Sequence, residues 1–261
     1  MPIAITRDVS NDLGRCELSY VERAPIDVAR AKHQHEAYRG ALESLGCRVE
    51  SLPAEHDLPD AVFVEDVILV FDELAIRTHP GAPSRRAEVA SVARAVERYR
   101  MLRAIEAPGT LDGGDVLRIG RTVYVGQSAR TNAAGIEQLR VLLSDASLGG
   151  VGYDVQAVPI RGCLHLKSSV TQVADDTVLV NPQWVDPAIF ARCRVIEIDP
   201  AEPHAANALK IGDGVIYPAS FPRTQRRLAE AGIALTIVDT SELQKAEGAT
   251  TCCSVIFRDI R

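Results

Sequence analysis

Hydrophobic and polar positions follow two alternating patterns along the chain. Short runs rich in β-branched residues, typical of strands, are separated by longer stretches in which apolar residues recur with helical spacing. These patterns recur in the order strand, strand, helix, strand, with a period of about 50 residues. This order predicts an α/β fold assembled from repeated units.

Three of the predicted units are continuous in the sequence. The first takes strands at 61–65, 68–71 and 74–78, a helix near 85–99 and a strand near 101–106. The second takes strands at 115–119 and 122–125, a helix near 132–143 and a strand at 153–158. The third takes strands at 168–173 and 177–181, a short helix near 187–191 and a strand at 194–198.

The remaining two units complete the set. A fourth uses the region before Leu209, a strand at 214–218, a helix near 222–231 and a strand at 234–238. The fifth is divided between the termini, with 253–258 pairing with 2–6, followed by a helix at 28–45 and a strand at 48–52. Joining both ends in one unit predicts a closed ring, which leaves no exposed sheet edge. An ordinary open α/β sheet is the alternative.

We predict that residues 1–261 form a single domain. No Ser/Gly/Pro-rich stretch separates compositionally distinct halves, and a hydrophobic content of 46% is sufficient for a well-filled core. The longest segment without periodicity is 8–25. Because a loop of this length in a compact domain is more often functional than idle, we expect it to close over a site.

Composition argues against several functional classes. A net charge of −6 and the lack of a dense Lys/Arg tract argue against nucleic acid or an anionic membrane as a partner. The N-terminus shows no basic region followed by an apolar stretch, and no apolar run approaches the roughly 20 residues that span a bilayer. We therefore predict a cytoplasmic protein. The six cysteines lack paired-ligand spacing, which favours free thiols over a disulfide framework or a structural zinc site.

Three short motifs carry the parts of a nucleophilic enzyme. Cys252 lies in Thr-Thr-Cys-Cys-Ser, His165 in Leu-His-Leu-Lys-Ser and Asp112 in Asp-Gly-Gly-Asp. A thiol, an imidazole and a carboxylate serve as nucleophile, acid/base and orienting group. In a strand, Cys252 and Cys253 would face opposite sides, so one would be the nucleophile and the other core filler. Taken singly, each motif also fits a structural role.

Charged residues indicate a ligand that carries both a cationic and an anionic group. Asp60, Glu65 and Asp66 lie in the apolar, strand-like run 58–67, where carboxylates are unfavourable unless they are paired or bind a cation. A guanidinium suits bidentate pairing, while a metal site and structural acids are the alternatives. Arg85 lies near a helix start that Ser84 is expected to cap, where a cation opposes the helix dipole. Arg130 occupies the corresponding place in the next unit, and two arginines suit a carboxylate.

Together these motifs resemble those of the dimethylarginine dimethylaminohydrolases, within the pentein or guanidino-modifying superfamily. The likeness covers nearly the whole chain, through residues 28–31, 58–67, 80–86, 110–116, 130–132, 164–168 and 251–254. The resemblance implies a five-bladed α/β propeller of ββαβ units with pseudo-fivefold symmetry. It also implies hydrolysis of N-omega-methylated arginine to citrulline and a methylamine through a covalent cysteine intermediate, without cofactor or metal.

The resemblance also assigns roles to individual residues. Cys252 matches the nucleophile, His165 the acid/base and Asp112 the carboxylate that orients the histidine. The implied substrate contacts are Leu18 in the lid, Asp60 at the α-ammonium, Glu65 and Asp66 at the guanidinium, Arg85 and Arg130 at the α-carboxylate, and Ala246 through its backbone carbonyl. The implied partner is a small cationic guanidino compound, and a homodimer is compatible with the sequence.

Other functions use the same parts. Arginine and agmatine deiminases and amidinotransferases share the nucleophile, although they are typically longer, and an agmatine site does not need two arginines. A non-catalytic propeller that binds guanidino ligands is the alternative from another class. The retention of the cysteine, the histidine and the aspartate together favours an enzyme.

Overall fold

The strands form five separate sheets of three strands each. The structure is a computed structural model that describes residues 1–144, 146 and 152–259. In chain order, the sheets consist of β15 (Val255–Arg258), β1 (Pro2–Arg7) and β2 (Arg48–Leu52); β3 (Ile68–Val70), β4 (Ala75–Arg77) and β5 (Leu102–Ala104); β6 (Val116–Ile119), β7 (Thr122–Gln127) and β8 (Asp154–Pro159); β9 (Val170–Ala174), β10 (Thr177–Val180) and β11 (Arg194–Glu197); and β12 (Leu209–Ile211), β13 (Gly214–Pro218) and β14 (Ala234–Val238).

Each sheet repeats one topology. The middle strand runs antiparallel to the first strand and parallel to the third. A parallel neighbour requires a crossover, and helical segments supply it. These are α1 (Val28–Ser44), η3 (Pro83–Glu88) with α2 (Val89–Glu97), α3 (Ala133–Leu142), η5 (Pro187–Phe190) and α5 (Pro222–Glu230). The predicted ββαβ repeat is therefore confirmed.

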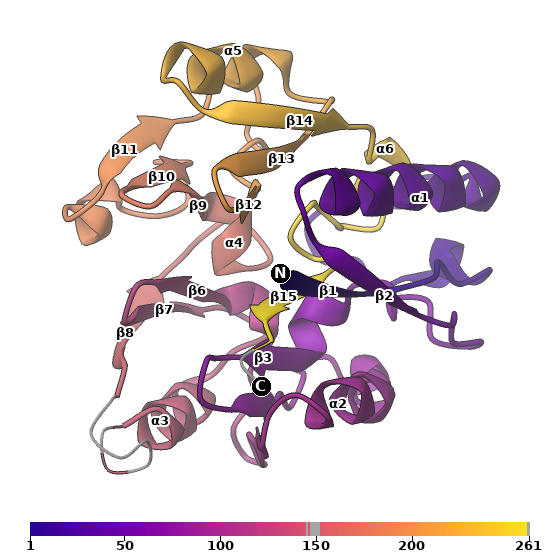
Figure 1. Cartoon of the computed structure of the whole chain (residues 1–261), viewed down its shortest axis with the longest axis vertical. Helices are drawn as coiled ribbons and strands as arrows, with labels where there is room; N and C mark the ends of the chain where they lie inside the picture. Colours follow the sequence, from indigo (N-terminus) through magenta and orange to yellow (C-terminus); the bar gives the residue numbers. More distant parts are fainter. Residues whose placement is uncertain (145, 147–151, 260–261) are drawn as a thin grey trace.

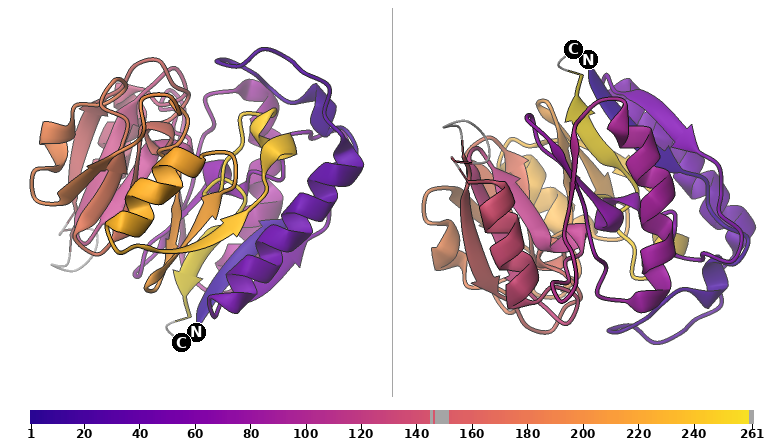
Figure 2. Two further views of the ribbon diagram at one scale, coloured as in Figure 1. Left: turned by 90° about the horizontal axis from the view of Figure 1, so that it is seen from above. Right: turned by 90° about the horizontal axis from the view of Figure 1, so that it is seen from below.

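The five units surround a common centre, as in a five-bladed propeller. The first strands of neighbouring units lie side by side, with β15 against β3, β6 against β9 and β9 against β12. Figure 1 shows α1, α2, α3 and α5 on the outside, and the short helix α4 (Leu166–Ser169) near the middle. The two chain ends lie together in both views of Figure 2, because β1 pairs with β15 in one sheet. The ring is thus closed by the termini.

Local signals explain where the long helices begin. The Asp27 side chain accepts a hydrogen bond from the backbone of Arg30 at the start of α1, and Asn132 does the same for Gly135 at the start of α3. The apolar core is distributed between neighbouring units, as in the cluster where Leu111 packs with residues of several strands and of α3. None of the described helices has the length and apolar character to cross a membrane.

Several predicted elements are corrected by the structure. Residues 61–65 form a turn and the start of η2 (Val64–Val67), not a strand. The backbone N–H of Glu65 in η2 donates to the carbonyl of Cys252 at 3.2 Å. The strand expected before Leu209 begins at Leu209, and the short helix of the third unit is a 3₁₀ helix. Cys252 and Cys253 lie in a turn before β15. The segment 8–25 is a loop that contains η1 (Leu13–Arg15).

Candidate active site

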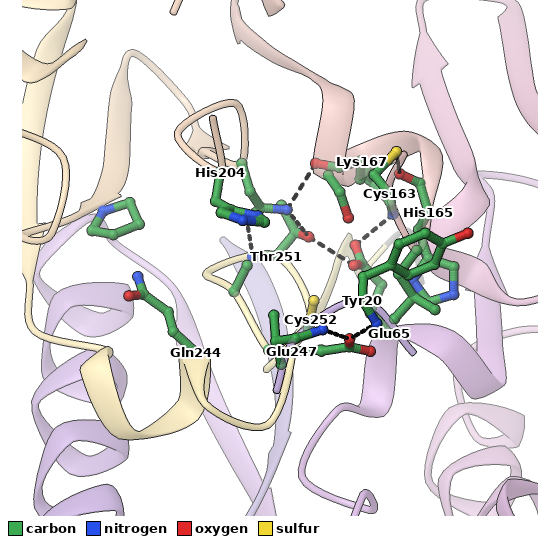
Figure 3. Close-up of a pocket in the computed structure, with 18 of the residues that line it drawn as sticks. Tyr20, Glu65, Cys163, His165, Lys167, His204, Gln244, Glu247, Thr251 and Cys252 are labelled. Carbon is green, nitrogen blue, oxygen red and sulfur yellow. Dashed lines mark hydrogen bonds and ion pairs between the residues drawn. The ribbon is translucent and has the colours of Figure 1, made fainter. Parts of the chain in front are cut away.

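A cavity of about 210 Å³ is lined by two of the three residues that the sequence analysis predicted to be catalytic, Cys252 and His165. Cys252, His165 and Glu65 line it, and Figure 3 shows their side chains converging from separate parts of the chain. A smaller hollow of about 20 Å³ shares Cys252 and His165 with this cavity. The rest of its lining includes Asp60, Asp66, Arg85, Arg130 and Ala246. The two spaces meet at the thiol and the imidazole.

The two adjacent cysteines differ in their surroundings. Cys252 is half-buried and lines both spaces, whereas Cys253 is buried in the core and donates its Sγ hydrogen to the carbonyl of Ala249 at 3.5 Å. The expectation that one cysteine faces the site is confirmed, although a turn rather than strand alternation separates them. Burial, and then the charges of Glu65 and Asp66, raise the pKa of Cys252 to about 12. The thiol is therefore protonated at neutral pH when no ligand is bound.

His165 lies between two buried carboxylates just before α4. Its Nε2 is 3.1 Å from Oδ2 of Asp112, and its Nδ1 is 3.8 Å from Oδ1 of Asp66. Burial alone lowers the pKa of His165, but Asp66, Asp112 and Asp115 outweigh it and raise the pKa to about 9. The imidazole is consequently a cation at neutral pH and has a proton to donate.

The Asp-Gly-Gly-Asp motif is explained by close packing at this point. A Cβ on Gly113 would lie 2.0 Å from the carbonyl oxygen of Glu65, and one on Gly114 would lie 2.5 Å from Nδ1 of His165. The glycines form η4 (Gly113–Asp115), and Gly114 donates its backbone N–H to Asp66 at 3.0 Å. Only glycine lets these backbones approach so closely.

Asp115, the last residue of this motif, positions the histidine segment although the sequence analysis gave it no role. Its Oδ1 accepts the backbone N–H of Leu166 at 2.9 Å, and its Oδ2 accepts from the Ser128 hydroxyl at 2.6 Å. Burial raises the pKa of Asp115 to about 6. Its place in the Asp-Gly-Gly-Asp motif was a signal that could have marked it. Asp112, which is fully buried, accepts from the backbone of Gly81 at 2.9 Å.

Glu65 has a cationic partner that the sequence analysis missed. The Lys167 ammonium lies 2.5 Å from Oε1 of Glu65, and the Thr251 hydroxyl donates to Oε2 at 2.8 Å. Burial raises the pKa of Glu65, and Lys167 opposes that rise. Lys167 stands two positions after His165 in the same motif, which was the available signal. It lines the larger cavity beside the thiol.

Arg85 is buried and paired with acids of the protein itself. Its guanidinium lies 2.5 Å from Asp66 and 2.7 Å from Glu88, and it also donates to the carbonyls of Asp60 and Phe63. The anion expected for an arginine at this position is therefore supplied by the chain. Burial favours the neutral form of Asp66, but His165 and Arg85 outweigh it and lower the pKa of that carboxyl to about 2.

The expected cap at Ser84 is wrong. Ala82 occupies the N-cap position of η3, and the Ser84 hydroxyl donates to Glu17 at 2.6 Å instead.

Of the remaining predicted residues, Asp60, Arg130 and Ala246 line the smaller hollow and Leu18 does not. Arg130 is 8% exposed and donates to the Ser19 hydroxyl at 3.3 Å, with Asp112 3.9 Å away. Asp60 accepts the backbone N–H of Glu17 at 3.1 Å, and burial raises its pKa. Ala246 is buried in the wall. Leu18 packs against the apolar cluster around α1, while its neighbours Tyr20 and Val21 line the larger cavity.

One group of side chains has the donor atoms of a metal site. Asp66, Asp112 and His165 bring ligand atoms within 4.8 Å of one another. Both carboxylates already accept hydrogen bonds, from Gly114 and Gly81 respectively, and Asp66 is paired with Arg85. The expectation of a metal-free reaction stays a prediction.

A ring of five ββαβ units around a central site with a thiol, an imidazole and buried carboxylates defines the pentein class of guanidino-modifying enzymes. Comparisons with known proteins identify a family within this class. Residues 93–204 match the family model described as arginine deiminase. The chain is 42% identical to the N(G),N(G)-dimethylarginine dimethylaminohydrolase of Streptomyces coelicolor, over 98% of this chain and 97% of that protein. The Pseudomonas aeruginosa enzyme of the same name is 37% identical, over 88% and 90%. The chain belongs to the dimethylarginine dimethylaminohydrolase family.

Solved structures agree with this assignment. A cysteine-to-serine mutant of the P. aeruginosa enzyme in complex with citrulline has a TM-score of 0.90 and 35% identity, covering 97% of this chain and 98% of that chain. An adduct of a dimethylarginine dimethylaminohydrolase variant with S-methyl-L-thiocitrulline gives the same values. The N-terminal domain of a cyanobacterial arginine dihydrolase, at 17% identity and a TM-score of 0.83, shares the fold.

Proposed function

We propose that this protein hydrolyses N-omega-methylated L-arginine, releasing L-citrulline and dimethylamine or methylamine. The observation that carries the proposal is the meeting of Cys252 and the protonated His165 at the junction of two spaces, one of which is lined by carboxylates and two arginines. Citrulline, the ligand of one related structure, is a product of this reaction, and S-methyl-L-thiocitrulline, which forms the adduct in another, carries a methylthio group in the place of the departing amine.

The smaller hollow suits the amino-acid end of the substrate. Asp60 is assigned to the α-ammonium and Arg130 to the α-carboxylate, because both lie in its wall with opposite charges. The carbonyl of Ala246 is a further acceptor there, and Leu18 belongs to the lid segment. Arg85 acts mainly through Asp66 and Glu88, since these acids hold its guanidinium. The N-methyl groups then face the larger cavity.

Substrate binding itself activates the thiol. Burial, together with the charges of Glu65 and Asp66, holds the pKa of Cys252 high when the site is empty, and a guanidinium placed beside these carboxylates offsets their charge. The thiol loses its proton to solvent water as the cation binds, and the thiolate attacks the guanidinium carbon to give a tetrahedral adduct. The raised pKa of Cys252 therefore favours a thiolate that forms with the substrate over one that exists beforehand.

His165 transfers protons in both halves of the reaction. Its cationic form gives a proton to the departing amine, the C–N bond breaks, and an S-alkylthiouronium remains on Cys252. The neutral imidazole then takes a proton from water, which attacks the same carbon, and the C–S bond breaks to release citrulline. Asp112 holds Nε2 of the ring throughout. These steps require no cofactor. The cytoplasmic location, the single domain and the homodimer stay predictions.

Citrulline release by the purified protein tests the proposal. Asymmetric dimethylarginine, monomethylarginine, arginine and agmatine are compared at equal concentration, with Cys252→Ser as the blank. We expect release from the two methylated compounds and little from the others. Preference for arginine or agmatine would move the function to a deiminase, which the partial match to the arginine deiminase model makes the second candidate. Release from none would favour a binding protein.

A further inference from the structure

Glu247 is held in an unusual set of contacts at the edge of the site. Its carboxylate accepts hydrogen bonds from three consecutive backbone N–H groups, those of Ser19 at 2.9 Å, Tyr20 and Val21 at 2.8 Å. Figure 3 shows the Glu247 carboxylate against the backbone at Tyr20, on the same side of the cavity as Cys252. A carboxylate that takes three amides in a row is an anion seated in a backbone nest.

The backbone at Glu247 supports this arrangement. Its φ of 56° is in the left-handed region, which is unfavourable for a residue with a Cβ. Asp57 is the other non-glycine residue with positive φ within 1–144, 146 and 152–259. Glu247 lines both spaces of the site and follows Ala246 directly. A strained residue of this kind persists when the contacts that it makes require it.

The loop that Glu247 holds also contacts both residues assigned to the amino-acid end of the substrate. The Ser19 hydroxyl accepts from Arg130, and the backbone N–H of Glu17 donates to Asp60. Ser19 and Tyr20 are themselves exposed, so apolar burial contributes little to fixing them. The Glu247 carboxylate is therefore a principal anchor of residues 19–21.

We propose that Glu247 is a positioning residue that fixes residues 17–21 beside the two spaces of the site and so aligns Arg130 and Asp60 with the α-carboxylate and α-ammonium of the substrate. This inference rests on the proposed function for the identity of the substrate. The negative charge of the carboxylate strengthens its hydrogen bonds to the three amides, because charge-assisted hydrogen bonds are about twice as strong as neutral ones. Loss of the anchor acts on substrate binding, since Cys252 and His165 are held by other contacts.

The experiment uses four variants of the full chain. Glu247→Ala removes the carboxylate, Glu247→Gly removes it while relieving the positive φ, and Glu247→Gln keeps the size without the charge. Glu22→Gln is the matched control, because Glu22 is exposed on the same segment. For Glu247→Ala and Glu247→Gly we expect KM for asymmetric dimethylarginine to rise about tenfold, with kcat within about threefold of the wild type. The KM of Glu247→Gln is expected to lie between that of these two variants and that of the wild type. The KM of Glu22→Gln is expected to match the wild type.

Amide hydrogen exchange gives a readout that does not depend on turnover. Exchange at residues 19–21 is expected to be at least about tenfold faster in Glu247→Ala than in the wild type, with the strands unchanged. Unchanged exchange at 19–21 would show that Glu247 does not anchor these residues and would overturn the proposal. Faster exchange with an unchanged KM would overturn the positioning role of Glu247. A full return to wild-type KM in Glu247→Gly would assign the effect to backbone strain and overturn the proposal. If the wild type released no citrulline, the proposed function would fail while exchange still tested the anchor.

Discussion

Replacing Arg85 tests whether this arginine stabilises the fold through its buried ion pairs or serves mainly as a substrate contact. Its guanidinium is 5% exposed and lies 2.5 Å from Asp66 and 2.7 Å from Glu88, whose side chains are 4% and 3% exposed. Arg85→Ala leaves two buried carboxylates without their shared cation. Breaking a buried ion pair by removing one partner costs about 3–5 kcal/mol of folding free energy. At about 2–4 °C per kcal/mol for a chain of this size, the melting temperature should fall by about 6–20 °C.

The loss should also depend on pH. Burial raises the pKa of Glu88 to about 7 even with Arg85 present, and without Arg85 the folded-state pKa of Glu88 would be higher still. A carboxyl whose pKa is raised by folding makes the protein less stable as pH rises through that range. The difference between wild type and Arg85→Ala should therefore be larger at pH 8 than at pH 5.5.

Thermal unfolding at both pH values measures the difference in melting temperature between the wild type and Arg85→Ala. Urea unfolding at pH 8 gives the difference in the free energy of unfolding. Arg86→Ala is the matched control, because Arg86 is exposed and its Nε donates to one backbone carbonyl, that of Pro80. It should change stability by no more than about 0.5 kcal/mol. A melting temperature of Arg85→Ala within about 2 °C of the wild type at pH 8 would refute the reasoning, as would a difference that does not change with pH.

Three further outcomes follow from the site. Cys252→Ser should abolish citrulline release with the fold intact, while Cys253→Ser, which alters a buried thiol outside both hollows, should retain much of it; the reverse result in the same assay would exchange the two roles. Because His165 must be protonated to release the amine, kcat should fall as pH rises through about 9, and a pH–rate profile that stays level to pH 10.5 would contradict this role. Arg130→Ala should raise KM for methylarginine while leaving stability nearly unchanged, since its nearest carboxylate is 3.9 Å away; an unchanged KM would exclude it from the carboxylate contact.

The regular part of this protein could be predicted from local sequence pattern. Period-2 and helical periodicities recur with nearly constant spacing, and they located the strands and helices of the five units within a few residues. The pairing of β1 with β15 was also predictable, because the terminal strands complete a unit that otherwise lacks members. The Asp-Gly-Gly-Asp, Leu-His-Leu-Lys-Ser and Thr-Thr-Cys-Cys-Ser motifs located the chemical groups of the site.

The segments that form the site itself were predicted least well. The acidic run at 61–65 and the Cys252–Cys253 pair both have strand-like composition, yet they form turns. The two segments bond to each other and not to a neighbouring strand: the backbone N–H of Glu65 donates to the carbonyl of Cys252. Tertiary contacts therefore outweighed local propensity at these positions.

The sequence by itself determined the repeat, the ring and the identity of the reactive groups, because each depends on periodicity or on short contiguous motifs. Only the tertiary structure decided which partner each buried charged group has. Arg85 pairs with Asp66, Lys167 with Glu65, and the Glu247 carboxylate with the amides of residues 19–21, across separations of 19, 102 and more than 220 positions. Such partners are selected by burial, where an unpaired charge is too unfavourable to persist, and burial is established only when the units close into a ring.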